Sequence, residues 1–124
     1  MKRHRVDSKT ASERMLWSHE NGFCWACGAT ERLHTHEIVR RSETAKALNV
    51  ANYARLCQSC HEEAHGGYIT KGVLVFLKGI YDRENLDIDW LRSHAIRKGI
   101  EVEFPERGSQ IYETAMRYGN FDRP

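Results

Sequence analysis

All four cysteines of the chain lie in two C-x2-C pairs, a spacing that is typical of zinc sites. The first pair is Cys24 and Cys27, and the second is Cys57 and Cys60. Two thiolates at this spacing can reach one zinc ion at about 2.3 Å each. A thioredoxin-like redox motif uses a single C-x2-C pair, and two disulfides would suit a secreted chain. The pattern therefore predicts a structural zinc held by all four thiolates.

Histidines lie between the cysteine pairs and directly after the second pair. Side chains alternate in character over residues 33–39, which predicts a strand or hairpin arm with His34 and His36 on one face. The second pair leads into a short run of helix formers that ends at a Gly-Gly pair. On such a helix His61 and His65 share a face, one turn apart. Each element thus presents two imidazoles on one side.

Read in order, these residues resemble the HNH endonuclease family. The ββα-metal module of that family, also called the His-Me finger, pairs a hairpin bearing an H-H-I or D-H-I motif with a helix that starts at a Cys-His dipeptide. The resemblance covers about residues 21–67 and rests on the cysteines, His36, Asn52 and His61. The hairpin motif here is H-E-I, with Glu37 in second place. The small size and the single module resemble phage or mobile-element proteins.

The resemblance implies an α+β fold in which a zinc-bound ββα-metal module is flanked by N- and C-terminal helices. It also implies that the chain hydrolyses phosphodiester bonds in DNA with a divalent metal. His36, His61 and His65 match the ligand positions for that metal. Mn2+, Ni2+, Zn2+ and Mg2+ are all candidates, although imidazoles suit the first three better than Mg2+, which prefers oxygen ligands.

Glu37 stands where most family members carry the histidine that acts as general base. A glutamate can take this role if burial or a negative neighbour raises its pKa, although an adjacent metal would lower it. His34 is the alternative base, because it lies on the same strand face as the ligand His36. Loss of catalysis is the third alternative. Asn52 matches the middle asparagine of the family, which ties the following loop to the hairpin and orients the site.

DNA is the expected partner, although net charge alone does not indicate it. Lys and Arg exceed Asp and Glu only by 19 to 17. Arg40 and Arg41 follow the histidine-bearing strand closely and are the favoured phosphate contacts. Arg55 is a weaker choice. A non-enzymatic alternative is a zinc-dependent DNA-binding accessory protein with a degenerate HNH site.

A second motif competes for the helix histidines. His61 to His65 is a complete H-E-x-x-H, which in metalloproteases holds zinc and uses the glutamate, here Glu62, as base. Glu84 would then supply the third ligand. Against this hypothesis, Cys60 already belongs to the structural zinc, and a protease leaves the hairpin histidine and the central asparagine unexplained.

The length of 124 residues predicts one domain. We expect a basic arm and helix over residues 1–20, the module over 21–70, and a helical extension that packs on it over 71–124. No apolar run matches a membrane span, and the N-terminus lacks the apolar stretch of a secretion signal. The expected location is therefore intracellular, and the resemblance implies the cytoplasm of a prokaryote or of a phage-infected cell.

Outside the module the sequence predicts mostly helices. The first should span about residues 11–20, with Met15 and Leu16 facing the core. Residues 42–48 should form a short helix or an ordered loop. Further elements are expected in the C-terminal part: helices over about residues 73–81, 87–98 and 109–118, and a short strand over 101–104.

Overall fold

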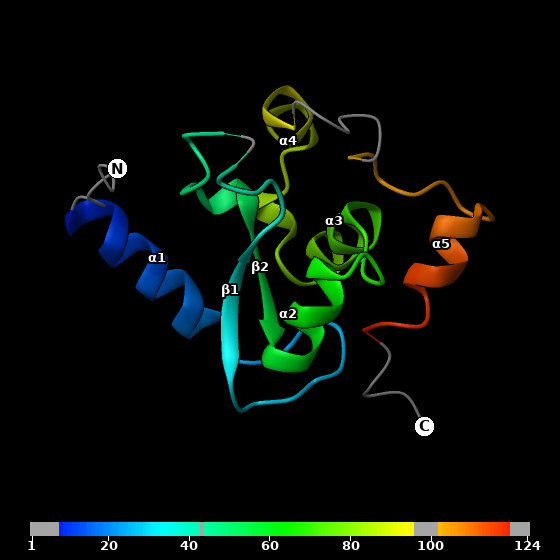
Figure 1. The fold of residues 1–124 in the computed structure, drawn as a ribbon, viewed down its shortest axis with the longest axis horizontal. Coiled ribbons are helices and arrows are strands. Elements are labelled where there is room, and N and C mark those ends of the chain that lie inside the picture. Colours follow the sequence, from blue (N-terminus) through cyan, green and yellow to red (C-terminus); the bar gives the residue numbers. More distant parts are fainter. Residues whose placement is uncertain (1–7, 43, 96–101, 120–124) are drawn as a thin grey trace.

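The computed structural model describes residues 8–42, 44–95 and 102–119, and in these ranges the chain is α+β. A two-stranded antiparallel hairpin is followed directly by a helix, and further helices come before and after this unit (Figure 1). The fold class matches the prediction. Of the expected basic arm at residues 1–9, residues 1–7 lie outside the described part, and Ser8 and Lys9 belong to the first helix. No helix within the described ranges is long and apolar enough to cross a membrane.

The hairpin consists of β1 (Leu33–Glu37) and β2 (Tyr53–Cys57). β1 ends two residues earlier than predicted. The amide of Ile38 still donates to the backbone oxygen of Asn52, its next partner in register, at 2.8 Å. The amide of Val39 donates instead to the side-chain Oδ1 of Asn52, at 2.7 Å. The strand therefore turns away at the point where the asparagine replaces a strand partner.

Helix α2 (Gln58–His65) starts in the residue after β2, so that hairpin and helix form one continuous unit. It ends at Gly66, and the following Gly67 has a φ of +86°, which suits glycine. The 3-10 turn η1 (Val50–Asn52) leads into β2. The described residues of the segment 42–48 form turns, so the loop alternative holds there and the helix does not.

Helix α1 (Ser8–Glu20) docks on the hairpin through one large side chain, Trp17. Its ring meets Trp25 and Tyr53 edge-on, with centroids 5.6 and 5.4 Å apart. Its indole nitrogen donates to Oδ2 of Asp82 at 2.8 Å. The buried face of α1 is thus narrow. Its tryptophan combines apolar ring contacts with one buried hydrogen bond to a carboxylate.

The prediction that Met15 and Leu16 face the core is wrong. Their side chains are 64% and 61% exposed, whereas Trp17 is 4% exposed. Neighbouring helix residues point about 100° apart, so these three side chains cannot all face inward. The tryptophan takes the buried position, where it has both ring partners and a hydrogen-bond acceptor.

The C-terminal part contains α3 (Lys71–Tyr81), η2 (Arg83–Asn85), α4 (Ile88–His94) and α5 (Gln110–Ala115). The middle of α3, residues 73–77, is buried and belongs to the same core cluster as the hairpin. Gly79 does not interrupt α3. A Cβ there would lie 2.6 Å from the ring of Phe104, so glycine lets that ring pack on the helix.

Two C-terminal predictions need correction or fall partly outside the described residues. α4 ends at His94, and the predicted continuation over residues 96–98 is not described. Residues 102–104, the described part of the predicted strand, are not a strand. Val102 is fully buried and Phe104 packs against Phe76 with centroids 5.9 Å apart. The alternating pattern reflects packing of a loop on α3.

Lys78 of α3 is a fully buried lysine whose ammonium group is saturated with hydrogen bonds. It donates to the carbonyl oxygens of Val50 and Tyr53 at 3.0 and 2.7 Å, and to Oδ2 of Asp82 at 2.9 Å. The same carboxylate oxygen accepts from Trp17. One buried ion pair thereby joins α1, the start of β2 and α3.

Candidate metal centres

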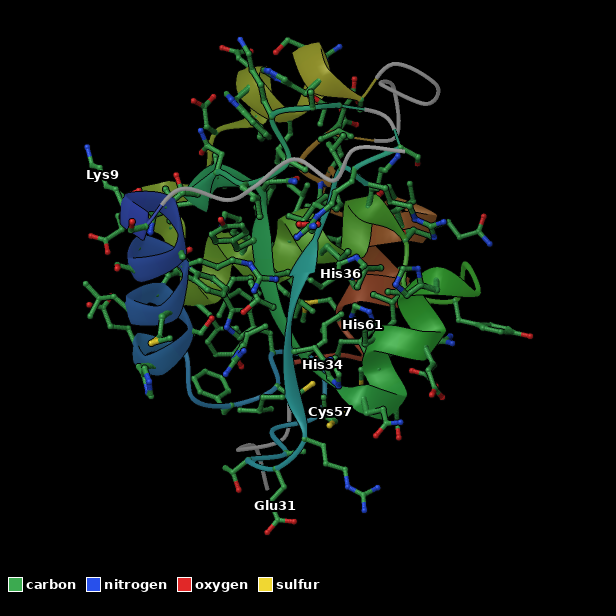
Figure 2. The ribbon with its side chains drawn as sticks, turned by 60° about the vertical axis from the view of Figure 1, so that its left-hand side comes forward. Lys9, Glu31, His34, His36, Cys57 and His61 are labelled. Atoms are coloured by element: carbon green, nitrogen blue, oxygen red, sulfur yellow. The ribbon has the colours of Figure 1, made fainter. Side chains whose placement is uncertain are left out.

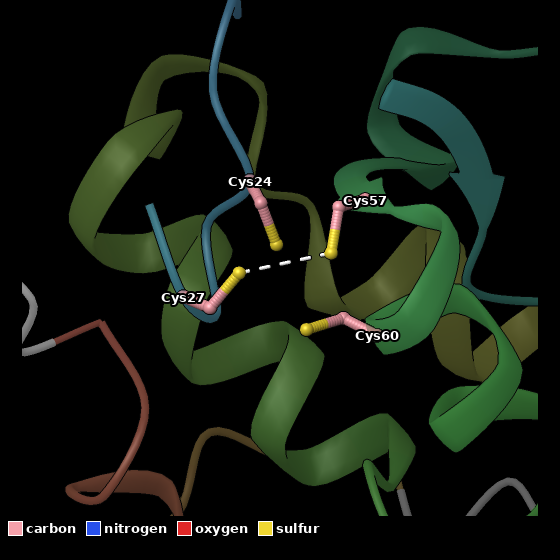
Figure 3. A group of neighbouring side chains, drawn as sticks. All are labelled: Cys24, Cys27, Cys57 and Cys60. Atoms are coloured by element: carbon pink, nitrogen blue, oxygen red, sulfur yellow. Dashed lines mark hydrogen bonds between the residues drawn. The ribbon is translucent and has the colours of Figure 1, made fainter. Parts of the chain in front are cut away.

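The four cysteines converge on one point, as Figure 3 shows. Their sulfur atoms all lie within 4.8 Å of one another. The Sγ atoms of Cys27 and Cys57 are 3.7 Å apart. Four thiolates about 2.3 Å from a tetrahedral zinc are separated by about 3.8 Å. The donor set and its spacing therefore fit a structural zinc.

Tight backbone geometry holds the first cysteine pair in place. The amide of Gly28 donates to the carbonyl oxygen of Cys24 at 2.8 Å, and Gly28 has a φ of +82° that favours glycine. The backbone amide of Trp25 donates to the carbonyl oxygen of Arg55 in β2 at 2.9 Å. The pair is thus fixed to the strand that leads into the other two cysteines.

Two thiols of this cluster, those of Cys27 and Cys60, need a nearby positive charge to ionise. Burial raises the pKa of Cys27 and of Cys60 above the usual value of a thiol. Burial also acts on Cys57, but hydrogen bonds from the backbone of Cys60 and from neighbouring thiols outweigh it and lower the pKa. A bound zinc would supply the missing charge.

Three histidines form a second cluster beside the hairpin. His36 of β1 meets His61 and His65 of α2, and one ring nitrogen of each lies within 4.8 Å of the others. The Nδ1 atoms of His36 and His61 are 3.3 Å apart, and the Nε2 atoms of His61 and His65 are 2.9 Å apart. Figure 2 shows His34, His36 and His61 along the side of β1 that faces α2.

Local structure explains this convergence. His34 and His36 are two residues apart and therefore lie on one face of β1. His36 stands opposite Ala54, whose side chain is small and fully buried. Because α2 begins immediately after β2, its first turn lies against the same face of the hairpin. His61 and His65, four residues apart, then point together toward β1.

The environment favours the neutral form of His36 and His61. Burial lowers the pKa of His36 to about 3, and the neighbouring His61, His65 and Arg40 contribute further. Burial also lowers the pKa of His61, followed by the effects of His65 and His34. Neutral imidazoles are the form that binds a metal ion. The cluster is therefore suited to a divalent cation.

The histidine cluster opens on one side into a pocket of about 220 Å³. His36 is buried, His61 is half-buried and His65 is exposed at this opening. The pocket is lined by Thr35, His36, Glu37, Arg40, Arg41, His61 and His65. A cation held by three imidazoles there keeps positions for water or a substrate oxygen, which is the pattern of catalytic rather than structural metal sites.

Glu37 lines this pocket, but its carboxylate is engaged by Arg41. The Nε atom of Arg41 donates to both carboxylate oxygens, at 2.9 and 3.1 Å. The side chain of Glu37 is 13% exposed and that of Arg41 is 62% exposed. The arginine thus covers the carboxylate from the solvent side. No signal in the sequence pointed to this pairing, because the two residues do not lie on a helix.

The alternative base, His34, is exposed and stacks on His61. Their ring centroids are 5.1 Å apart and their planes differ by 25°. His34 does not belong to the three-nitrogen cluster. Its ring lies at the edge of the site and is open to water.

Asn52 is completely buried and all its side-chain hydrogen-bonding groups have partners. Its Nδ2 donates to the carbonyl oxygens of Val39 and Ala47, at 2.8 and 2.9 Å, and its Oδ1 accepts from the amide of Val39. These contacts tie the loop after β1 to the entry of β2. Asn52 therefore positions this loop against the hairpin.

The remaining predicted arginines differ in surroundings. Arg40 lines the histidine pocket and donates to the carbonyl oxygen of His65 at 3.3 Å. Arg55 lies instead on the far side of the hairpin, where it donates to the carbonyl oxygen of Asn21 and to Oγ1 of Thr35. Arg40 and Arg41 thus meet at the cluster, and Arg55 does not.

The geometry does not favour the protease hypothesis. The third group beside His61 and His65 is His36, and Glu84 is not part of this cluster. Glu62, which would have to act as base, lines a different pocket beside Cys57. The H-E-x-x-H spacing follows from a helix that turns two histidines toward a hairpin.

Comparison of the chain with protein-family models, with curated proteins and with solved structures gives no match. The function must therefore be inferred from the residues themselves. They form one group of four cysteines and one group of three histidines, beside a hairpin followed by a helix. This arrangement is compatible with a ββα-metal module.

Proposed function

We propose that the chain is a metal-dependent DNA endonuclease of the HNH type. The observation that carries this proposal is the meeting of His36, His61 and His65 at one open pocket that also contains two arginines and a carboxylate. Phosphodiester hydrolysis needs those three kinds of group in one place: a cation site, phosphate-binding side chains and a proton acceptor.

The three imidazoles would hold the cation, with Mn2+, Ni2+ or Zn2+ preferred over Mg2+. Bound there, the ion would neutralise negative charge on the phosphate and on the leaving oxygen. Arg40 and Arg41 stand at the rim of the same pocket and would orient the phosphate through charge-assisted hydrogen bonds. A structural zinc in the cysteine cluster would fix α2 against the hairpin.

Proton transfer would fall to Glu37 or to His34. A phosphate that draws Arg41 toward itself would release the carboxylate of Glu37, so substrate binding and activation of the base would be linked. His34 needs no such release, because its ring is exposed beside His61. Asn52 would hold the loop that carries the arginines in register with β1.

The second candidate function is DNA binding without cleavage. The observation that favours it is the engagement of both Glu37 oxygens by Arg41, which leaves the carboxylate occupied. If the arginine stays in place when DNA binds, the chain holds DNA and metal but lacks this base. The two functions differ only in whether the bound strand is cut.

A plasmid-nicking assay separates these functions. The parent chain is tested with Mn2+, Ni2+, Zn2+ and Mg2+, beside His61→Ala, Glu37→Gln and His34→Gln. The exposed His19→Ala serves as a matched control on α1. We expect cleavage by the parent and by His19→Ala, and none above background by His61→Ala.

The base variants decide the mechanism. Loss of cleavage in Glu37→Gln alone assigns the base to Glu37, and loss in His34→Gln alone assigns it to His34. If no metal supports cleavage by the parent while the protein still shifts DNA in a gel, the nuclease proposal is wrong and the binding function stands. Casein digestion that disappears in Glu62→Ala would favour the protease instead.

A further inference from the structure

A second hollow, of about 720 Å³, lies between α1 and the hairpin, next to the histidine pocket. Its α1 wall is one helix face, formed by Ala11, Arg14, Met15 and Ser18. Thr35, Arg41 and His61 line both hollows, so the two are neighbours. We call the larger hollow the α1 groove. It lies along β1, beside the cluster of imidazoles.

The α1 groove is positively charged. Arg14, Arg41 and Arg55 line it, and no Asp or Glu is among its lining residues in the described part of the chain. Arg41 is neutralised by Glu37, but the bonds of the other two arginines run to uncharged oxygens. Arg14 donates to the carbonyl oxygen of Thr35 at 3.2 Å, and Arg55 donates to Oγ1 of the same threonine at 3.0 Å.

These two guanidinium groups are held in place before any ligand arrives. Arg55 is fixed by a second bond, to the carbonyl oxygen of Asn21 at 2.9 Å. The Nε atom of Arg14 is buried and has no hydrogen-bond partner. Side chains that are already ordered lose little entropy on binding. A guanidinium has five donors, so each arginine keeps N–H groups for phosphate oxygens beyond these bonds and the buried Nε of Arg14. Two uncompensated cations beside an open groove attract a polyanion.

We infer that the α1 groove binds the sugar–phosphate backbone of the DNA strand that enters the histidine pocket, with Arg14 and Arg55 as phosphate-binding side chains. The inference rests on the proposed nuclease function and adds the path of the substrate to it. Met15 and Leu33 place apolar surface between the cations, where the sugar faces of the backbone would lie. Met15, which is exposed on α1, thus forms part of the groove wall.

The test changes the charge of the groove without removing a contact. Ala11 lies exposed on the α1 wall, so Ala11→Glu and Ala11→Lys add opposite charges there. Gln110→Glu and Gln110→Lys are the matched controls at the exposed start of α5, on the opposite side of the hairpin from α1 (Figure 1). Affinity for a short fluorescein-labelled duplex is measured by anisotropy over a range of salt concentrations, with zinc-loaded full-length chain and no other divalent metal.

We expect Ala11→Glu to weaken DNA binding about fivefold and Ala11→Lys to strengthen it by a similar factor at low salt. Arg14→Gln should weaken binding and reduce the slope of log K against log salt by about 0.9, the loss of one phosphate contact. Both Gln110 variants should match the parent. Thermal melting monitors folding, and opposite shifts from one position cannot come from a folding defect.

The outcomes separate this inference from the proposed function, because nicking is measured on the same variants. If the two Ala11 variants bind DNA as the parent does while the parent cleaves it, the groove assignment is wrong and the nuclease stands. If the charge shifts appear but no metal supports cleavage, the groove stands and the nuclease proposal falls. Failure of the parent to bind DNA overturns both, and tighter binding of an RNA of the same sequence overturns the assignment to DNA.

Discussion

The cysteine cluster and the histidine cluster are neighbours on α2, yet they are built for different tasks. Cys60 and His61 are consecutive residues, so one helix start contributes to both. The cysteine cluster has four donors, three of them buried, which closes a tetrahedral site. The histidine cluster has three donors and opens into a pocket. The closed cysteine cluster can thus position the open histidine cluster, because their ligands Cys60 and His61 are neighbours in the chain.

The two clusters also differ in what they hold together. The cysteines join three segments, namely the turn at Cys24 and Cys27, the end of β2 and the start of α2. The histidines join only β1 and α2. These two elements are already connected through β2, which pairs with β1 and leads directly into α2. Zinc loss should therefore unfold the unit, whereas loss of the second metal should leave the fold intact.

The largest effect is expected from the cysteine cluster. Cys57→Ser should lose zinc and its cooperative thermal transition, because structural zinc sites contribute about 10 kcal/mol or more of apparent binding free energy, comparable to the whole stability of a domain. Zinc content by plasma mass spectrometry and circular dichroism melting measure both quantities. A variant that melts like the parent without zinc would show that the cluster is not structural.

Asn52→Ala should destabilise the chain by about 3 kcal/mol, because three buried hydrogen bonds are lost and their backbone partners stay unpaired. Asn49→Ala is the matched control. Asn49 is exposed and caps η1 with one bond to the amide of Ala51, so its loss should cost about 1 kcal/mol. Urea unfolding measures both. Equal losses would contradict the positioning role of Asn52.

His61→Ala should leave the melting temperature close to that of the parent but reduce DNA cleavage by at least about a hundredfold, since even residues that only support metal ligands contribute about 10–100-fold. Nickel titration by calorimetry should show loss of one binding site per chain, while zinc in the cysteine cluster remains. His19→Ala should behave as the parent in both assays. If His61→Ala unfolds together with loss of zinc, the two clusters are not separable.

The smallest effect concerns pH. His36 keeps a pKa of about 3 in the folded chain, against about 6.5 when unfolded. The unfolded chain therefore binds more protons between these values, and stability falls as pH is lowered through this window. Acidification from pH 7 to pH 5 should lower the free energy of unfolding by about 2 kcal/mol through this histidine.

The control for this pH effect is His36→Gln, which lacks the titrating ring. Both proteins carry one equivalent of zinc, and urea unfolding at pH 7 and pH 5 gives their free energies of unfolding. The parent should lose more stability than the variant on acidification. Equal losses would mean that burial does not hold His36 neutral.

The sequence predicted both clusters by two different routes. Two residues along a strand and four along a helix determine which side chains share a face, which pairs His61 with His65. The grouping of His36 with these two came from the resemblance to the HNH family. The C-x2-C spacing grouped the cysteines. The short link between β2 and α2 then left few ways to arrange the two elements.

Tertiary competition explains what could not be predicted. Met15, Leu16 and Trp17 are all apolar, and only the partners Trp25 and Tyr53 decide that the tryptophan is buried. The loop at residues 102–104 alternates like a strand but packs on α3, with no strand beside it in the described chain.

Two features of the site also escaped the sequence. The pairing of Glu37 with Arg41 depends on how the chain turns after β1. Arg14 was missed although it stands three residues before the buried Trp17, on the inward side of α1. The three-residue spacing between Arg14 and a tryptophan that is expected to be buried is the signal that could have predicted its position.

The buried Lys78 has a practical consequence for anyone who wants to transplant this module. A fragment of residues 21–70 would lack the ammonium group that satisfies the carbonyl oxygens of Val50 and Tyr53, together with the carboxylate that Lys78 shares with Trp17. Orphaned carbonyls inside a core are costly. A portable unit should therefore include at least the chain from α1 through Asn85, the residue that completes the bonding of the Asp82 carboxylate.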